Sequence, residues 1–211
     1  MNIADIRKEY SQGALNEGSL PQNPVEGLRQ WFQEAVKAQV MEPNAMVLST
    51  VNRQGRPSSR VVLLKEISER GIVFFTNYLS RKGQEIEADN HVSVNFFWPE
   101  LERQVRIEGQ AYQIPAEDSD AYFYSRPRLS QAGAIASAQS QVVESREVLD
   151  AKMAEMMANP EQELQRPEHW GGYEIVVEYA EFWQGRPGRV HDRIAYFETG
   201  PSTFQTKRLS P

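Results

Sequence analysis

Apolar residues that recur at every second position constrain the fold of this chain more than any other feature. The pattern is clearest at Val92, Val94, Phe96 and Trp98. It returns between residues 105 and 111 and again between residues 173 and 179. A period of two is that of a β-strand whose two faces differ in polarity. The sequence therefore predicts a sheet whose strands each carry one polar face.

The rest of the chain predicts further strands, joined by turns and by a few helices. Strands are expected at 46–51, 60–66, 72–76, 189–197 and 204–209. A first helix is expected after Asn23, because Pro24 and Glu26 complete the pattern of a capped helix start. Further helices are expected at 80–88, 116–124, 129–137 and 144–158. The simplest fold is α+β and mainly β, an antiparallel barrel with peripheral helices.

Composition narrows the class of protein. With 211 residues, 40% hydrophobic and 25% charged, the chain has the balance of a soluble globular protein. The absence of cysteine excludes disulfides and thiolate catalysis, and neither a metal site nor a glycine-rich nucleotide loop is expected. No long apolar run or apolar leader occurs, so a cytoplasmic location without membrane insertion is expected. The net charge of −6 argues against a nucleic-acid partner.

The segment from Arg60 to Lys65 places a cation at each end of four apolar residues. Apolar side chains on both faces predict a central strand. Five strand steps put the two cations on opposite faces and about 17 Å apart, so one phosphate cannot easily be bound by both. The alternative is that both cations simply reach solvent.

Ser80, Arg81 and Lys82 form a second basic motif at a predicted helix start. Ser80 is a good N-cap, and the two cations would then lie in the first turn, where the helix dipole disfavours positive charge. A bound anion would resolve this conflict, because free N–H groups and cations favour a phosphate there. A solvated basic turn is the competing interpretation.

Two further clusters carry cations. In the segment 122–130, Pro127 ends a helix near Arg126, and tyrosine, arginine and serine side chains could converge on a second phosphate. A structural corner between helices is the alternative. In the segment 189–193, a regular strand would place Arg189, His191 and Arg193 on one face, about 7 Å apart, unless this is only a solvated exterior.

Taken together, an ordered set of motifs resembles the pyridoxamine 5′-phosphate oxidase family along nearly the whole chain. The motifs are RVVLLK at 60–65, FTN at 75–77, SRK at 80–82, LERQV at 101–105, SRPR at 125–128, EFWQG at 181–185, RVHDR at 189–193 and RLSP at 208–211. One departure is Phe204, where the family commonly has tryptophan.

The resemblance implies a homodimeric split β-barrel with FMN at the subunit interface. It implies that pyridoxamine or pyridoxine 5′-phosphate is oxidised to pyridoxal 5′-phosphate, with O2 as electron acceptor and peroxide as product. A flavin requirement is consistent with the chemistry, because no side chain accepts a hydride. Residues 1–20 are expected to form a mobile segment and residues 21–211 a single FMN-binding domain.

The resemblance also assigns site residues. Those expected to contact FMN are Arg60, Val61, Val62, Leu63, Leu64, Lys65, Phe75, Thr76, Arg81, Lys82, Gln104, Gln139, Ser140, Trp183 and Arg193. Of these, Gln139 and Ser140 are expected to reach in from the partner subunit. Those expected to contact substrate are Arg7, Lys8, Glu9, Tyr10, Lys65, Tyr122, Arg126, Ser130, Arg189 and His191. Arg189 and His191 are the expected catalytic residues, and Arg7 to Tyr10 an expected lid.

Two alternatives stay open at this point. One is a related FMN-dependent oxidase with another substrate, of the phenazine-pathway type, which should lack the residues for the vitamer phosphate. The other is a non-catalytic module that binds flavin or pyridoxal phosphate, which should lack Arg189 or His191. All of these residues are present here.

Overall fold

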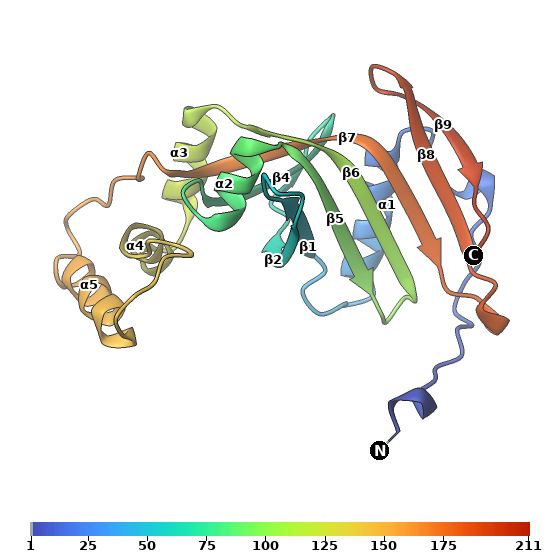
Figure 1. Cartoon of the computed structure of the whole chain (residues 1–211), viewed down its shortest axis with the longest axis horizontal. Helices are drawn as coiled ribbons and strands as arrows, with labels where there is room; N and C mark the ends of the chain where they lie inside the picture. The colour runs from blue at the N-terminus through green and yellow to red at the C-terminus, as the bar shows by residue number, and fades with distance from the viewer. Residues whose placement is uncertain (1) are drawn as a thin grey trace.

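Within residues 2–211, which the computed structural model describes, nine strands pair into one antiparallel sheet (Figure 1). The strands are β1 (Ala45–Val51), β2 (Pro57–Leu63), β3 (Glu66–Ile67), β4 (Gly71–Asn77), β5 (His91–Trp98), β6 (Arg103–Gln113), β7 (Trp170–Gln184), β8 (Asp192–Gly200) and β9 (Thr203–Arg208). Their order is β2-β1-β5-β6-β7-β4-β3, and β8 and β9 extend from β7. Every strand predicted from the sequence has a counterpart, and the predicted fold, mainly β with an antiparallel sheet, is confirmed.

The long strand β7 joins the two parts of the sheet. Its first half, Trp170 to Val176, pairs with β4, and its second half, Tyr179 to Gln184, pairs with β8. Along its other edge it pairs with β6 over most of its length. One strand therefore links the region around β4 to the opposite end of the molecule, where β8 and β9 lie (Figure 1).

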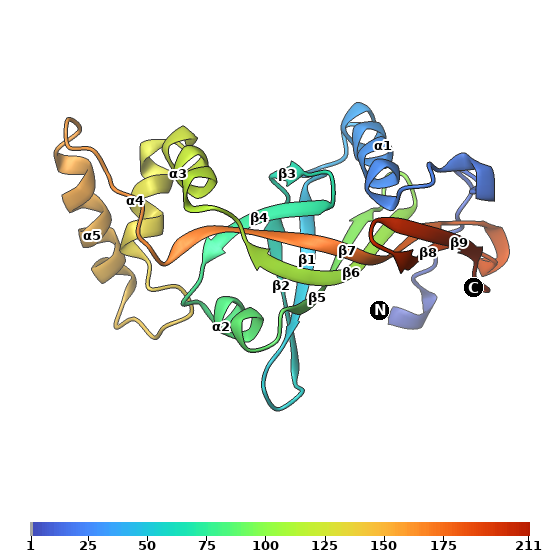
Figure 2. The ribbon, with the colours of Figure 1, turned by 90° about the horizontal axis from the view of Figure 1, so that it is seen from above.

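Five helices attach to this sheet in the described chain. They are α1 (Pro24–Lys37), α2 (Arg81–Ala88), α3 (Ala116–Ser125), α4 (Arg128–Ala136) and α5 (Arg146–Ala158). Helices α3, α4 and α5 gather at the end of the molecule remote from β8 and β9, and α1 and α2 lie on opposite sides of the sheet (Figure 2). No helix in residues 2–211 has the length and apolar character needed to cross a membrane.

Helix α1 covers the core face of the sheet. It begins as predicted, because the Asn23 side chain accepts a hydrogen bond from the Val25 N–H at 2.8 Å and Pro24 occupies the first turn. Its buried residues include Leu28 and Trp31, and the Trp31 ring meets Phe182 of β7 edge-on at 5.1 Å. This packing covers the face of the sheet on which Phe182 of β7 lies and leaves the opposite face free of helix α1.

Strand β2 corrects an expectation. The sequence predicts a central strand from Arg60 to Lys65, but β2 is an edge strand that ends at Leu63 and pairs with β1. Val61 is 64% exposed and Leu63 38% exposed. The apolar run is therefore not explained by burial within one chain, and these side chains are free to meet a second surface.

The N-terminal segment joins the hydrophobic core at residues that were expected to be mobile. Leu15 and Leu20 are buried and belong to the main core. The backbone N–H groups of Ser11 and Gln12 donate to the buried carboxylate of Glu102 at 2.8 and 3.0 Å. The packed part of the chain thus begins before residue 21, where the sequence placed the domain boundary.

Candidate functional site

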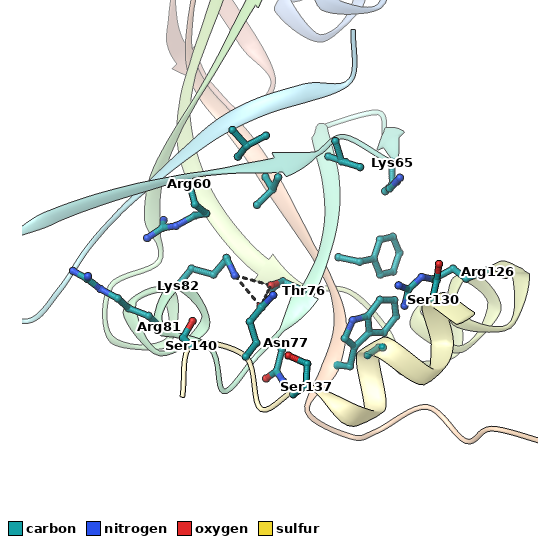
Figure 3. A pocket seen from close by; sticks show the side chains of 18 of the residues that line it. Arg60, Lys65, Thr76, Asn77, Arg81, Lys82, Arg126, Ser130, Ser137 and Ser140 are labelled. Atoms are coloured by element: carbon teal, nitrogen blue, oxygen red, sulfur yellow. Dashed lines mark hydrogen bonds between the residues drawn. The ribbon is translucent and has the colours of Figure 1, made fainter. Parts of the chain in front are cut away.

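A cavity of about 1040 Å³ lies between β2, β4, the start of α2 and the corner between α3 and α4 (Figure 3). It brings together most of the predicted site residues. Those lining it are Arg60, Val61, Val62, Leu63, Lys65, Phe75, Thr76, Arg81, Lys82, Tyr122, Arg126, Ser130, Gln139 and Ser140. Leu64 was expected to line the site, but its side chain is buried in the hydrophobic core.

The first cationic group of the cavity forms at the start of α2. The Ser80 hydroxyl caps this helix by accepting the Gly83 N–H at 3.3 Å. The Lys82 ammonium is 8% exposed and donates to Gln139 Oε1 at 2.9 Å and to Thr76 Oγ1 at 3.1 Å. In the described chain its partners are neutral oxygens, and burial lowers its pKa to about 8. A buried ammonium with neutral partners favours an anionic ligand.

Two arginines flank Lys82, and sequence reasoning missed the group that holds them. The carboxylate of Glu85 accepts from Arg81 Nε at 2.9 Å and from Arg60 Nη2 at 3.3 Å. Burial opposes ionisation of Glu85, but hydrogen bonds from neighbouring hydroxyls and from Arg81 outweigh it and lower the pKa of Glu85 to about 2. Glu85 lies one turn after Arg81, a spacing that could have indicated the contact.

The second cationic group lies on the other side of the cavity (Figure 3). The Arg126 guanidinium stacks 4.6 Å from the centroid of the Trp170 ring, and the Tyr122 ring stacks on Phe75 at 3.9 Å. Lys65 Nζ lies 6.0 Å from the centroid of Tyr122. Arg126 Nη1 is buried with no hydrogen-bond partner among residues 2–211, and burial lowers the Arg126 pKa. This unpartnered donor in a cavity favours an anion over a purely structural corner.

The neighbouring Arg128 has the structural role that Arg126 lacks. Its Nη2 donates to the carbonyl oxygens of Met156 and Asn159 at 2.9 and 2.8 Å, near the end of α5. These contacts satisfy carbonyl groups that a helix end leaves free. The two arginines of the SRPR motif therefore differ in their contacts, although the sequence presents them alike.

Three predicted residues lie on the open face of the sheet and not in the cavity. Strand register aligns Phe97, Gln104, Trp183 and Arg193 in one row across β5, β6, β7 and β8. The buried carboxylate of Glu181 accepts two hydrogen bonds from Arg193, at 2.8 and 2.9 Å. These bonds fix the orientation of Arg193. Within one chain, however, Gln104, Trp183 and Arg193 do not line the cavity that holds the other predicted cofactor contacts.

A smaller cavity of about 450 Å³ gathers the N-terminal motif with Arg189. Arg7, Lys8, Glu9, Tyr10 and Arg186 also line it. The Tyr10 ring lies edge-on to Trp183 at 5.7 Å and to His191 at 5.6 Å. His191 Nδ1 accepts the Arg186 N–H at 3.1 Å, which leaves Nε2 to face other groups.

The predicted strand across 189–193 is wrong at its start. Arg189 belongs to a short 3-10 turn, Pro187–Arg189, and β8 begins only at Asp192. Gly188 and Arg189 have φ of 65° and 62°, in the left-handed region. Glycine adopts this conformation readily, so Gly188 allows the turn that breaks the expected alternation.

Comparison with known proteins identifies the family. Residues 32–158 match the family described as pyridoxamine 5′-phosphate oxidase. The chain belongs to this family. Residues 170–211 match the pyridoxine 5′-phosphate oxidase C-terminal dimerisation region, which here comprises β7, β8 and β9.

Curated members of the oxidase family match along the whole chain. The pyridoxine/pyridoxamine 5′-phosphate oxidase of Haemophilus influenzae is 53% identical over 211 residues, which is all of both chains. That of Paraburkholderia phymatum is 51% identical over 99% of both. The crystal structure of PhzG from Burkholderia lata 383, in complex with tetrahydrophenazine-1-carboxylic acid, has a TM-score of 0.89 at 34% identity and covers 94% of this chain and 98% of its own. An FMN-binding protein from Nostoc punctiforme shares the fold, with a TM-score of 0.69 at 14% identity.

One placement in this oxidase fold differs from the expectation. Gln139 and Ser140 were expected to reach the site from a partner subunit, but both line the cavity of their own chain. Gln139 Oε1 accepts from Lys82 and from Thr76. The loop after α4 runs back toward α2 in the same chain, so no second subunit is needed to bring Gln139 to Lys82.

Proposed function

We propose that this protein oxidises pyridoxamine 5′-phosphate or pyridoxine 5′-phosphate to pyridoxal 5′-phosphate with FMN as cofactor. The electrons pass to O2, which yields H2O2. The observation that carries the proposal is a single cavity with two separate cationic groups, one around Lys82 and one around Arg126. Two phosphorylated ligands, the cofactor and the substrate, need two such groups.

The residues around α2 fit the phosphate of FMN. Lys82 is buried against neutral oxygens, and the capped start of α2 adds a helix dipole that favours an anion. The cavity volume is at the upper end of what a single small ligand occupies, which leaves room for the substrate beside the flavin. When bound, FMN supplies the hydride acceptor that side chains do not provide.

The second group fits the phosphate of the substrate. Arg126 offers a half-buried guanidinium with one buried nitrogen, Nη1, that has no partner among residues 2–211, and Ser130 and Lys65 add further donors from the cavity wall. The presence of this group is what favours a phosphorylated vitamer over an unphosphorylated phenazine precursor.

A homodimer completes the site in this proposal. The dimerisation region contains Trp183, Arg189, His191 and Arg193, none of which lines the large cavity of its own chain. We infer that the row from Gln104 to Arg193 faces the FMN of the other subunit, so that FMN lies at the interface. The exposed Val61 and Leu63 on β2, beside the cavity, support a subunit contact there.

Arg189 and His191 are the proposed catalytic residues, and they act on the substrate ring. Arg189 lies at the tip of a turn and is proposed to hold the pyridine ring in place for transfer from C4′. His191 is fixed through Nδ1 and is proposed to orient the substrate through Nε2. The segment from Arg7 to Tyr10, which lies against Trp183 and His191, is the proposed lid.

An anaerobic spectrum of the FMN-loaded protein tests the proposal. Addition of pyridoxamine 5′-phosphate should bleach the flavin band, and air should restore it with formation of pyridoxal 5′-phosphate and H2O2. Flavin that binds but does not bleach would refute the substrate assignment and favour a related oxidase. Failure to bind flavin would refute the cofactor as well.

The affinity of the apoprotein for FMN should fall as pH rises through about 8, where Lys82 loses its proton. Phosphate binding favours the ammonium form, so affinity is complete below this pKa and declines above it by up to about tenfold per pH unit. The FMN phosphate stays dianionic from pH 7 to 9, because its second pKa is about 6. A Lys82→Arg variant stays charged and should show a flatter profile in fluorescence titrations, whereas equal slopes would contradict the role of Lys82.

A further inference from the structure

Glu85 is a buried carboxylate at the edge of the cofactor cavity that the proposed reaction does not use. It is 6% exposed and belongs to α2, one turn after the two cations that begin this helix. It does not line the cavity, so it is not placed to touch a ligand. The negative charge of a carboxylate near a phosphate site disfavours binding of the phosphate. The presence of Glu85 there therefore indicates a second, compensating role.

The contacts of Glu85 show which groups it holds. Oε2 accepts from Thr50 Oγ1 at 2.5 Å, from Ser58 Oγ at 2.7 Å and from Arg60 Nη2 at 3.3 Å. Oε1 accepts from Arg81 Nε at 2.9 Å. One carboxylate therefore joins β1, β2 and α2. In Figure 3 the side chains of Arg60 and Arg81 extend to the same side of the view, while Lys82 extends toward Thr76.

The pattern of bonds leaves Arg81 able to bind a second anion, whereas both Nη groups of Arg60 already donate to Leu48, Thr50, Ser58 and Glu85. Arg81 uses only Nε for Glu85, and its two Nη groups point elsewhere on a side chain that is 62% exposed. A guanidinium fixed through Nε presents its Nη donors in one orientation, and less side-chain entropy is lost when an anion binds. The local charge also fits, because Arg60, Arg81 and Lys82 against Glu85 leave two positive charges for a phosphate dianion.

We propose that Glu85 is a positioning residue that orients Arg81 for the phosphate group of FMN and holds the charge of Arg60 beside it. This inference rests on the proposed function. It assigns Glu85 no contact with flavin or substrate. Its effect should be confined to ligands that carry the phosphate.

The test compares FMN with riboflavin, which lacks the phosphate, in fluorescence titrations of the full-length apoprotein. Glu85→Gln should weaken FMN binding at least about tenfold, because charge-assisted bonds to both arginines are lost. Riboflavin affinity should change less than about twofold. Glu87→Gln is the matched control, since Glu87 lies exposed on the same helix and the substitution removes the same charge. It should leave FMN affinity unchanged.

The sign of the effect separates the two roles that Glu85 could have. If Glu85 only repelled the phosphate, Glu85→Gln would bind FMN more tightly, and that result or an unchanged affinity would overturn the proposal. An equal loss for FMN and riboflavin would indicate a structural role and would also overturn it. Wild-type protein that binds FMN no better than riboflavin would instead refute the proposed cofactor site, and the inference with it.

Thr50→Val provides a second test that does not depend on the folding of Glu85→Gln. Thr50 is fully buried, does not line the cavity and donates to Glu85. Valine keeps its shape but removes the hydrogen bond. A loss of FMN affinity without loss of riboflavin affinity would support the proposal, since Thr50 is linked to the phosphate site through Glu85 and through its neighbours Arg60 and Ser58. Equal affinities for wild type and variant would count against it.

Discussion

Replacing Phe97 by glutamate is expected to produce a monomer that no longer retains FMN. Phe97 lies on β5 in the same row as Gln104, Trp183 and Arg193, and it is 52% exposed in the single chain. In a dimer that buries this row, each subunit would carry an unpaired carboxylate into the interface. Burial of such a charge costs several kcal/mol, and every 1.4 kcal/mol weakens association about tenfold. Light scattering should show the monomer mass, and gel filtration should separate it from flavin.

Val36→Glu is the matched control for this experiment. Val36 is also 52% exposed, but it lies on α1, which covers the other face of the sheet. The control should remain dimeric with full flavin content. If Phe97→Glu also remained a dimer with bound FMN, the open face of β5 to β8 would not be the subunit interface, and the second half of the site would have to come from elsewhere.

The elements that the sequence predicted well are those fixed by local pattern. The period of two at Val92 to Trp98 and the capped start of α1 at Asn23 depend on residues close in the chain, and both appear as expected. The helix start at Ser80 was predictable for the same reason, because the cap and the two cations that follow it are neighbours in sequence.

The errors arise where a residue's environment depends on distant parts of the chain or on a second chain. The apolar run after Arg60 indicated a central strand, but β2 lies at the sheet edge, and its Val61 is exposed on the wall of the large cavity. Glu85 was missed because Thr50 and Ser58, which bury it, are 35 and 27 residues away. Arg189 departs from its predicted strand because Gly188 and Arg189 itself both adopt left-handed backbone conformations.

The two cationic groups of the cavity differ in how they are neutralised, and this difference is consistent with the proposed cofactor and substrate sites. The group at α2 contains its own carboxylate, Glu85, whereas Arg126 is stacked on Trp170 and keeps a buried nitrogen without a partner among residues 2–211. A cofactor site is filled for most of the protein's life, while a substrate site empties at each turnover. Stacking on an aromatic ring lets Arg126 remain ordered between ligands without a competing carboxylate.

Replacing Arg126 by methionine is therefore expected to lower kcat/KM for pyridoxamine 5′-phosphate by roughly 100-fold. Loss of a hydrogen-bonded charge contact costs about 1.5–3 kcal/mol, and the upper end applies because the site is buried. The phosphate lies away from the reacting carbon, so the loss should appear in KM more than in kcat. Steady-state kinetics with phosphorylated and unphosphorylated pyridoxamine would measure it, and only the phosphorylated substrate should be affected.

Arg128→Met makes the same chemical change two residues away. It should lower thermal stability, because the carbonyls near the end of α5 lose their donors, but it should leave KM within about threefold of wild type. Arg126→Met should show the opposite pair of effects. The apoprotein should be at least as stable as wild type, since a buried guanidinium nitrogen without a partner is removed, and KM should be raised. A normal KM in Arg126→Met would place the substrate phosphate elsewhere. The two variants together thus separate recognition of the phosphate from support of the corner that surrounds it.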